Sequence, residues 1–459
     1  MDPFVNAILG VLFVVAGAVA TLVMYQMRGS TAGPESGDEP TWDPAGHEDD
    51  SQEYLAAWQR SGDDREQTMA DIHTMATTGR SMIEPMRTGK QVVCWDDLLI
   101  QGAQLARLPL NEDVPVCTRT TIGPAAGHPL VIETPVLISH MSFGALSREI
   151  KVALARGSAA AQTAICSGEG GILEAELLAA YRYVFEYVPH QYSVTDENLK
   201  RVAAIEIKIG QSAKPGMGGH LPGKKVTAEI AAVRGRPEGR DIISPAHFSD
   251  IRTPEDLARK VHELRQRSEG RPIGIKIAAG HIEEDLAFVL QANPDFVTID
   301  GRAGATGAAL KLIKDATSIP TLFALHRARR FLDQHQAKHV SLVITGGLRI
   351  ASDFAKALAL GADAIAISTA ALLAAGCQQY RICHTGRCPV GITSQDPQLR
   401  ARLLVDKSAG RLENFLRVTN HELATFARLT GHDNVHHLSL VDLCTTNSEI
   451  SNHTEIAHV

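Results

Sequence analysis

The sequence predicts an α/β fold, and more specifically a (β/α)8 TIM barrel, from three observations. Short apolar runs rich in β-branched residues recur from about residue 130 onward. Most of these runs end in a turn that contains glycine, and helical patterns separate most of them. Eight such units occupy about 240 residues, which is the number and the size expected of a (β/α)8 barrel.

The eight predicted strands are almost uninterrupted apolar segments, which indicates strands buried on both faces, as in a parallel sheet. In chain order they are Pro135–Phe143, Thr163–Gly168, Ala204–Gly210, Ile273–Gly280, Pro294–Gly301, Thr321–Leu325, Ser341–Gly347 and Ala362–Thr369. An open, doubly wound sheet is the alternative. The first strand is not followed by a G-x-G-x-x-G turn, which argues against a dinucleotide-binding version of that sheet.

The first 28 residues differ from the rest of the chain. Residues 7–25 carry no charge, and at a rise of 1.5 Å per residue they are long enough to span about 30 Å of hydrocarbon. A cleaved signal peptide is the alternative, but only residues 1–6, which include Asp2, precede the apolar run. We therefore predict a transmembrane anchor in residues 1–28. Acidic residues soon follow Arg28, so the charge bias for its orientation is weak.

Composition divides the remaining chain into four regions. Residues 29–50 are rich in Gly, Pro, Ser and acids and predict a flexible linker. Residues 51–129 predict a helical N-terminal cap, residues 130–375 the barrel, and residues 376–459 a cysteine-rich loop with a helical tail. Hydrophobic residues make up 44% of the chain, as in a globular protein. A net charge of -7 without a Lys/Arg run argues against a nucleic-acid partner.

Functional residues of such a barrel gather at the carboxyl ends of the strands. The seventh and eighth predicted strands end in Gly346-Gly347 and Ser368-Thr369. Glycines permit close approach of the backbone and the hydroxyls add donors, so these two loops are predicted to hold a phosphate. Tight turns without a ligand are the alternative interpretation.

Lys276 interrupts the apolar fourth predicted strand, where an unpaired ammonium would be costly. An anionic partner is therefore expected, either an electron-rich flavin ring or an acid of a neighbouring strand such as Asp300. In the loop after the third predicted strand and just beyond it, Lys214 and Arg234 suit a small dicarboxylate, although a solvated lysine-rich loop has the same composition. Glu169 lies between glycines, where it is predicted to bind or move a proton; a helix cap is the alternative interpretation.

Three of the seven cysteines lie within twelve residues, with the spacing C-x5-C-x4-C. This spacing differs from the C-x-x-C-H of haem attachment and from paired zinc knuckles, and a cytosolic location disfavours disulfides. Three thiolates in one loop, the last followed by Pro389, resemble iron–sulfur ligation. Chance clustering is the alternative. The scattered cysteines are predicted to be ordinary buried thiols: Cys94, Cys117, Cys166 and Cys444.

Seven motifs in order resemble the FMN-binding synthase domain of glutamate synthase over roughly residues 130–400. They are MSFGALS (Met141–Ser147), CSGEGG (Cys166–Gly171), AKPGMGGHLPGKKV (Ala213–Val226), ISPAHFSDI (Ile243–Ile251), DGRAGATGA (Asp300–Ala308), TGGLR (Thr345–Arg349) and CQQYRICHTGRCPVGITSQDP (Cys377–Pro397). The resemblance implies a (β/α)8 barrel that holds FMN, with a 3Fe-4S cluster beside it. It also implies reductive amination of 2-oxoglutarate through 2-iminoglutarate.

The resemblance assigns roles to individual positions. Lys214 and Arg234 match the residues that bind the carboxylates of 2-oxoglutarate, and Glu169 matches the acid beside that site. His220, in the substrate loop, stands where the family commonly has Gln, and Ala303 and Ala305 also depart from the family pattern. The predicted FMN-binding residues are Met141, Ser142, Ser167, Lys276, Gly346, Gly347, Ser368 and Thr369, and the predicted cluster ligands are Cys377, Cys383 and Cys388.

The sequence therefore predicts a flavin and iron–sulfur oxidoreductase acting on CH–NH2 donors, anchored in a membrane with its catalytic domain in the cytoplasm. It would make glutamate from a 2-oxo acid and ammonia or an amine. Electron-donor and amidotransferase-type subunits are the expected partners. Two alternatives remain: a subunit of N-methylglutamate synthase (a methylamine–glutamate N-methyltransferase), and a membrane electron-transfer subunit without synthase activity of its own.

Overall fold

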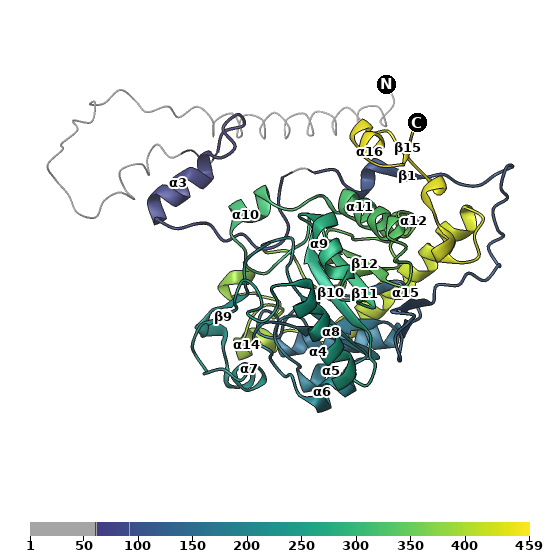
Figure 1. The fold of residues 1–459 in the computed structure, drawn as a ribbon. Helices are drawn as coiled ribbons and strands as arrows, with labels where there is room; N and C mark the ends of the chain where they lie inside the picture. Colours follow the sequence, from purple (N-terminus) through teal and green to yellow (C-terminus); the bar gives the residue numbers. More distant parts are fainter. Residues whose placement is uncertain (1–59, 61, 91) are drawn as a thin grey trace, which may run out of the picture. The chain divides into compact units, whose positions relative to one another are not determined.

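The computed structural model describes residues 60, 62–90 and 92–459 (Figure 1). The chain forms two compact units, Met1–Thr77 and Thr78–Val459. The first unit contains most of helix α3 (Met69–Thr78), and the second contains every other element named below. The predicted anchor and linker lie outside the described residues. In the part of the chain that is described, no helix combines the length and the apolar character that crossing a bilayer requires.

Eight parallel strands of the second unit close into a barrel, which confirms the predicted fold. Each strand pairs with the next one around the barrel, and the last pairs with the first. In order they are β4 (Val136–Ile138), β5 (Ala164–Cys166), β6 (Arg182–Tyr187), β7 (Ala204–Lys208), β10 (Ile273–Ala278), β11 (Phe296–Asp300), β12 (Ser341–Thr345) and β13 (Ala364–Ile367).

The sequence prediction was wrong for one strand and missed another. Thr321–Leu325 is not a strand but the start of helix α11 (Thr321–Gln334). The third strand of the barrel is β6, which carries Glu186 in its interior. A charged residue in the middle conceals a buried strand, whereas a short apolar run is shared by strands and by the buried face of a helix. One predicted strand was absent and one observed strand was not predicted, so the predicted number of strands, eight, was still correct.

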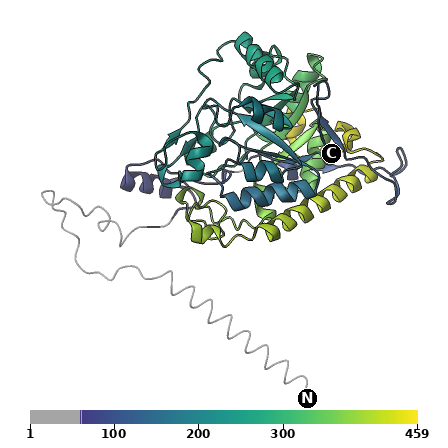
Figure 2. The same ribbon diagram turned by 90° about the horizontal axis from the view of Figure 1, so that it is seen from below.

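Helices cover the outside of the barrel (Figure 2). Those that follow strands include α4 (Arg148–Ala160), α5 (Glu174–Ala179), α6 (Asp196–Arg201), α8 (Pro254–Arg267), α9 (Ile282–Leu290), α10 (Lys311–Ala316), α11, α12 (Ala351–Ala359) and α13 (Thr369–Ala374). The start of α8 agrees with its sequence, since the hydroxyl of Thr253 accepts from the Asp256 N–H at 3.3 Å and Pro254 occupies the first turn.

The barrel interior changes from apolar to charged toward the carboxyl ends of the strands. Val184 and Phe296 belong to an apolar cluster inside the barrel. Two residues further along β6 and four further along β11, on the same faces, Glu186 and Asp300 are buried. Lys276 on β10 is also buried, with its ammonium 3.5 Å from Glu186. The polar end of the barrel is therefore the end at which ligand-binding loops are expected.

The cap predicted for residues 51–129 is largely not helical where it is described. Beyond α3 it contains a 3-10 turn at Trp95–Asp97 and the strands β1 (Leu98–Ile100) and β2 (Thr120–Ile122), the latter paired with β3 (Leu130–Ile132). Long irregular segments connect them. Prolines, and polar residues between short apolar runs, favour such extended segments over helices.

The tail is helical as predicted, but it also contains strands. Helix α15 (Val405–Leu429) packs along α4, and Figure 2 shows it as the long helix at one edge of the barrel. Gly157 of α4 permits this approach, since a Cβ there would lie 2.8 Å from the Ala409 carbonyl. After α15, β14 (Leu443–Thr445) pairs with β1, so the tail is joined to the cap; α14 (Pro397–Arg400), α16 (Ser448–His453) and β15 (Ala457–His458) complete it.

Candidate active site

Glu169 and Lys208 form an ion pair at the carboxyl ends of β5 and β7. Both side chains are almost entirely buried. Burial opposes the charged form of Glu169, but the ammonium of Lys208, the Ser244 hydroxyl and Lys214 together lower its pKa to about 2. Glu169 is therefore a carboxylate at neutral pH. Lys208 was not among the predicted site residues, although it lies within a predicted strand and ends the observed strand β7.

Lys214 follows in the loop after β7 and lies in the same charged cluster. Its Nζ donates to the Gly218 carbonyl at 2.9 Å. Burial, together with the neighbouring charge of Lys208, lowers the pKa of Lys214 to about 8. An ammonium with this pKa exchanges a proton close to neutral pH.

Arg234 ends helix α7 (Ala228–Arg234) and points into the same region. Its Nη2 donates to the Phe143 carbonyl at 2.7 Å, and the guanidinium carbon lies 5.3 Å from the centre of the Tyr192 ring. The buried Nε finds no hydrogen-bond partner among the described residues. Burial lowers the pKa of this guanidinium. A buried donor without an acceptor is what an anionic ligand would satisfy.

Three cations and one carboxylate thus share the mouth of the barrel. Lys208, Lys214 and Arg234 exceed the charge of Glu169 by two, which suits a dianion. His220 is not part of this cluster. It lies on the exposed strand β8 (His220–Leu221), where its Nε2 meets Asp241 Oδ2 at 2.7 Å.

Beneath the cluster, the barrel interior holds a second set of charges. Lys276 Nζ lies 3.5 Å from Glu186 Oε1, an oxygen with no hydrogen-bond partner among the described residues. Glu186 is therefore the acid nearest to Lys276, whereas Asp300, the acid named from the sequence, accepts from the Ser212 hydroxyl at 2.8 Å. A pair at 3.5 Å is longer than a good charge-assisted hydrogen bond, so the ammonium retains capacity for another anion.

His140, Cys166 and Glu206 complete this interior layer. One ligand atom from each lies within 4.8 Å of the others. His140 and Glu206 form an ion pair. Burial lowers the pKa of His140, but Cys166 and Glu206 raise it to about 10 overall. The imidazolium therefore keeps its proton at neutral pH, and the ion pair accounts for the cluster.

The loops after β4 and β5, which carry Met141, Ser142 and Ser167, are packed backbone to backbone. Gly168 has φ +68°, and a Cβ there would lie 2.5 Å from the Ser142 nitrogen. The buried ammonium of Lys151 joins the same loops, since it donates to the Met141 carbonyl at 2.5 Å and to the Ser167 carbonyl at 2.9 Å. These three predicted residues therefore lie together.

Gly346 and Gly347 follow β12 with φ values of +115° and +89°, which only glycine adopts readily. Arg349 follows them after Leu348 and is half-buried, and Arg87 lies near it. Burial and the charge of Arg87 lower the pKa of Arg349 to about 10. Within residues 60, 62–90 and 92–459, neither arginine forms an ion pair with a carboxylate. Two such cations beside a glycine turn suit a phosphate, and the sequence prediction included neither of them.

Ser368 and Thr369 lie at the start of α13, after the strand next to β12. The predicted phosphate residues are therefore on adjacent strands. Thr369 is buried and Ser368 is half-buried.

The three clustered cysteines lie in the loop after α13 and carry free thiols. The Cys377 N–H donates to the Leu372 carbonyl at 2.8 Å, and Cys388 is buried. Burial raises the pKa of Cys383, and the neighbouring thiols of Cys377 and Cys388 add to the effect. Of the four scattered cysteines, Cys166 and Cys444 are buried as predicted; the prediction was wrong for Cys94 and Cys117, which are exposed.

Side chains tie the cysteine loop to the rest of the site. Lys225, a buried residue of the loop that contains Lys214, donates to the Cys383 carbonyl at 2.8 Å. Gln395 Nε2 donates to the Gly144 and Leu146 carbonyls at 3.2 and 3.1 Å. The cysteine loop is therefore bonded both to the loop after β7 and to the loop after β4.

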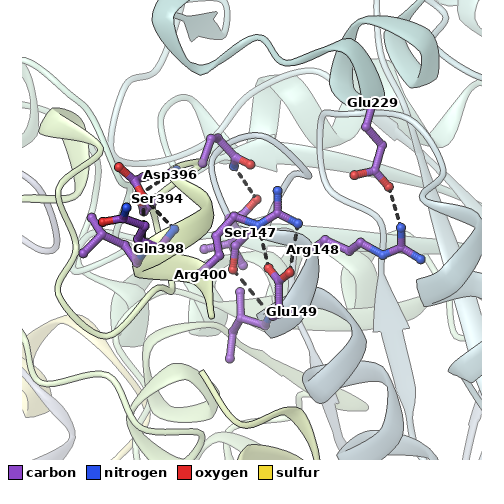
Figure 3. Close-up of polar contacts among 12 residues, drawn as sticks. Ser147, Arg148, Glu149, Glu229, Ser394, Asp396, Gln398 and Arg400 are labelled. Atoms are coloured by element: carbon purple, nitrogen blue, oxygen red, sulfur yellow. Dashed lines mark hydrogen bonds and ion pairs between the residues drawn. The ribbon is translucent and has the colours of Figure 1, made fainter. Parts of the chain in front are cut away.

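Two ion pairs at the start of α4 join it to the segment that follows the cysteines and to α7 (Figure 3). Both Arg400 nitrogens drawn toward α4 reach Glu149, with Nε to Oε2 at 2.8 Å and Nη2 to Oε1 at 2.9 Å. Arg148 on the same turn bonds Glu229 of α7 at 3.0 Å. The start of α4 therefore connects α7, the loop after β4 and the cysteine-bearing segment.

A closed parallel barrel with excess positive charge at its mouth defines a (β/α)8 protein built to bind anionic ligands. Comparison with known sequences gives the family. The model of the conserved region in glutamate synthase matches residues 75–433. This chain belongs to the glutamate synthase family.

Two relatives illustrate the match. A glutamate synthase large subunit-like protein of Rhizobium meliloti is 37% identical over 402 residues, which cover 83% of this chain and 91% of the relative. An archaeal glutamate synthase (NADPH) of Methanocaldococcus jannaschii is 40% identical over 403 residues, covering 80% and 78%. Among solved structures, a mandelate oxidase variant with a monooxide FMN adduct aligns at 16% identity and a TM-score of 0.48, covering 76% of this chain and 88% of that one.

Proposed function

We propose that this protein makes glutamate by reductive amination of 2-oxoglutarate. The observation that carries the proposal is the cluster of Lys208, Lys214 and Arg234 around Glu169 at the barrel mouth, in a member of the glutamate synthase family. The charge of this cluster matches a dicarboxylate, and its burial strengthens each ion pair. Reduction of an imine requires electrons, and the neighbouring residues suit the two cofactors that would supply them.

The chain's own residues bind and orient the keto acid. Arg234 offers its unpartnered Nε and Lys214 its ammonium to the two carboxylates. Glu169 stays ionised beside them, so it acts through its charge, favouring a cationic nitrogen and holding Lys208 in place. The enclosed position of the cluster limits the water that would hydrolyse an imine.

Lys214 is the group suited to proton transfer. Loss of water from the carbinolamine needs a proton on the departing oxygen, and a donor with a pKa of about 8 supplies it near neutral pH. Glu169, with a pKa of about 2, is a poor donor at that pH. The charges around Glu169 and Lys214 therefore favour Lys214 for proton transfer.

The residues fit FMN, which supplies hydride to the imine carbon when it is bound. The Gly346-Gly347 turn with Arg349 and Arg87 would hold its phosphate, helped by Ser368 and Thr369. Lys276, only loosely paired with Glu186, would face the electron-rich edge of its ring. The segments Met141-Ser142 and Ser167 would line its face.

The cysteine loop fits a 3Fe-4S cluster, which passes single electrons when it is bound. Its ligands would be Cys377, Cys383 and Cys388, three free thiols near one another in one loop. Gln379 Nε2 already donates to Cys377 Sγ at 3.3 Å, a kind of bond that tunes such clusters. Gln395 connects this loop to the loop after β4, so the two cofactor sites would be neighbours.

The test is anaerobic turnover with full-length protein reconstituted with FMN, iron and sulfide. Dithionite serves as reductant, and 2-oxoglutarate and ammonia as substrates. We expect glutamate in amounts that match the electrons consumed. A protein that reoxidises its flavin with an added acceptor but forms no glutamate would instead be an electron-transfer subunit, and the proposal would be wrong.

The N-terminal apolar segment adds a proposal about location and partners. We infer that residues 7–25 anchor the chain in a membrane, with the barrel on the cytoplasmic side, where separate electron-donor and amidotransferase-type subunits would serve it. The proposal is supported by the sequence of this segment, which has no charged residue and is long enough to span the hydrocarbon core of a bilayer. Deleting residues 1–28 should move the protein from the membrane to the soluble fraction of its host. Protein that stays with the membrane after this deletion is anchored by something else.

A further inference from the structure

Lys225 places a buried ammonium beside the cysteine loop. The residue is only 7% exposed. Its Nζ donates to the Cys383 carbonyl at 2.8 Å and to the Thr393 carbonyl at 3.5 Å. It is also close enough to the thiols of Cys383 and Cys388 for their charges to interact. Within the described residues, no carboxylate forms an ion pair with Lys225. A buried ammonium that contacts only carbonyl dipoles is costly, so an anion is expected beside it.

The hydroxyl of Thr393 is a second buried donor at the same place. Thr393 is 6% exposed, and its Oγ1 has no hydrogen-bond partner among the residues that the structure describes. The hydroxyl lies close to the Cys383 thiol, but the two groups form no hydrogen bond. Buried hydroxyls normally find an acceptor. The protein atoms described in the structure therefore leave this donor free for an acceptor at the thiols.

The segment that carries the thiols supplies no negative charge of its own. Residues 377–395 contain two arginines, Arg381 and Arg387, and no aspartate or glutamate. Both arginines are exposed, and neither forms an ion pair in the part of the chain that the structure describes. The segment is therefore positively charged, and it offers no carboxylate to the ammonium of Lys225 or to the hydroxyl of Thr393.

A three-iron cluster on Cys377, Cys383 and Cys388 would supply the missing anion. Three thiolates outweigh the positive charge of the oxidised iron–sulfide core, and reduction adds one more negative charge. A fixed ammonium and a hydrogen-bond donor beside the sulfurs stabilise the more negative state more strongly. The reduction potential of an iron–sulfur cluster depends on such charges and hydrogen bonds. Lys225 and Thr393 are therefore placed to control this potential.

We propose that Lys225 and Thr393 raise the reduction potential of this cluster, Lys225 through its charge and Thr393 through a hydrogen bond to a sulfur. The inference rests on the proposed function, because it concerns the cluster assigned there. Neither side chain binds iron. The step that they favour is the gain of one electron from a reductant, dithionite in the assay, and no proton or group is transferred. The two residues thus help electrons to enter the protein.

The test is an anaerobic redox titration of full-length protein reconstituted with FMN, iron and sulfide, followed by the EPR signal of the oxidised cluster. Lys225→Met should shift the reduction equilibrium at least tenfold toward the oxidised state, which is about 59 mV for one electron. Thr393→Val exchanges the hydroxyl for a methyl group of similar size and should give a smaller shift in the same direction. This variant tests the site even if Lys225→Met holds little cluster. Unchanged potentials overturn the inference.

Matched variants separate these effects from a loss of structure. Lys225→Arg keeps the charge and Thr393→Ser keeps the hydroxyl, so both should retain a potential close to that of the unaltered protein. Lys224→Met removes the same charge from the neighbouring exposed lysine, where water and salt screen it, and should shift the potential much less than Lys225→Met. Equal shifts from the two lysines contradict a specific role for Lys225. Reduced cluster content with an unchanged potential would show that Lys225 only joins the two loops.

Glutamate assays on the same samples separate this inference from the proposed function. Shifted potentials in a protein that makes no glutamate would support the inference and count against the proposed function. Glutamate formation with one potential in every variant would leave the proposed function standing and the inference wrong. Absence of an iron–sulfur EPR signal from the unaltered, reconstituted protein would overturn the cluster assignment and this inference together, whether or not glutamate forms.

Discussion

Lys151 Nζ and Glu176 Oε1 form an ion pair of 2.7 Å between side chains that are 1% and 0% exposed. The hydroxyl of Tyr183 donates to the other carboxylate oxygen of Glu176 at 2.8 Å. The remaining bonds of the Lys151 ammonium go to the carbonyls of Met141 and Ser167. One buried ammonium thus holds together two segments predicted to contact FMN.

Replacing Lys151 should loosen the flavin site as well as the fold. Lys151→Met leaves Glu176 buried without its partner, which we expect to cost about 3–5 kcal/mol of unfolding free energy. FMN affinity, followed by flavin fluorescence, should fall at least tenfold. The matched control is Lys356→Met, which removes another buried lysine whose Nζ donates to the Trp95 carbonyl at 2.8 Å. It should lower stability without changing FMN affinity.

The double variant Lys151→Met with Glu176→Leu separates the two effects. With both charges removed, much of the stability should return, but the tie between the Met141 and Ser167 carbonyls stays broken. FMN affinity should therefore remain low. Recovery of both properties together would show that Lys151 has only a structural role.

Activity should fall as the pH rises through about 8, where Lys214 loses its proton. The neutral amine neither attracts a carboxylate nor donates a proton, so kcat/KM for 2-oxoglutarate decreases on the alkaline side. The check is a pH profile measured with a saturating amine concentration. Lys214→Arg keeps a positive charge at higher pH. In this variant the alkaline decrease of kcat/KM for 2-oxoglutarate should therefore move to higher pH. An unchanged profile in Lys214→Arg would assign the limb to another group.

Removing one clustered thiol should abolish the iron–sulfur signal. Cys383→Ser is expected to reduce bound iron and the EPR signal of the oxidised protein to background, because each ligand is required to hold a three-iron cluster. Cys444→Ser is the control, since Cys444 is also free but lies in β14. FMN content should be retained in both variants. Full iron content in Cys383→Ser would contradict the assignment of this ligand.

Gly347→Ala should damage the phosphate turn. Gly347 has φ +89°, and a Cβ there would lie 2.6 Å from the Ala303 Cβ, so strain and overlap together should cost about 1–3 kcal/mol. FMN should bind more weakly, as measured by equilibrium dialysis. Gly376→Ala is the comparison, because Gly376 has φ +120° but nothing within 4 Å of its added Cβ. Adding Ala303→Gly to Gly347→Ala should restore part of the loss; no recovery would mean that strain alone acts.

The sequence predicted the parts of the molecule that follow a strong local pattern. Apolar strands ending in glycine turns identified seven of the eight barrel strands, although their ends shifted by several residues. Because parallel strands all end at one rim, the order of the strands and loops suffices to place Glu169 and Lys214 together. Arg234 reaches the same site from the end of α7, which the strand order alone does not give. The three cysteines were close in sequence and are close in space.

The features that the sequence did not reveal depend on distant partners. Glu186 made β6 resemble an exposed segment, because nothing local shows that Lys276 of another strand lies near it. Lys151 occupies a helix with several charged residues, so its complete burial could not be inferred. Arg87 and Arg349 are far apart in the sequence, and only the fold brings these two charges together.

The bonds from Lys151 and Lys225 end on main-chain carbonyls, which every amino acid provides. Exchanges at Met141, Ser167 or Cys383 therefore leave the accepting oxygen in place and change only the side chain that faces the ligand. Related proteins with this barrel can therefore change their ligand one residue at a time, while the loops at the barrel mouth keep their conformation. The two lysines themselves cannot be exchanged in this way, because their ammonium groups are the donors. Among the residues at the barrel mouth, they should therefore change most slowly in evolution.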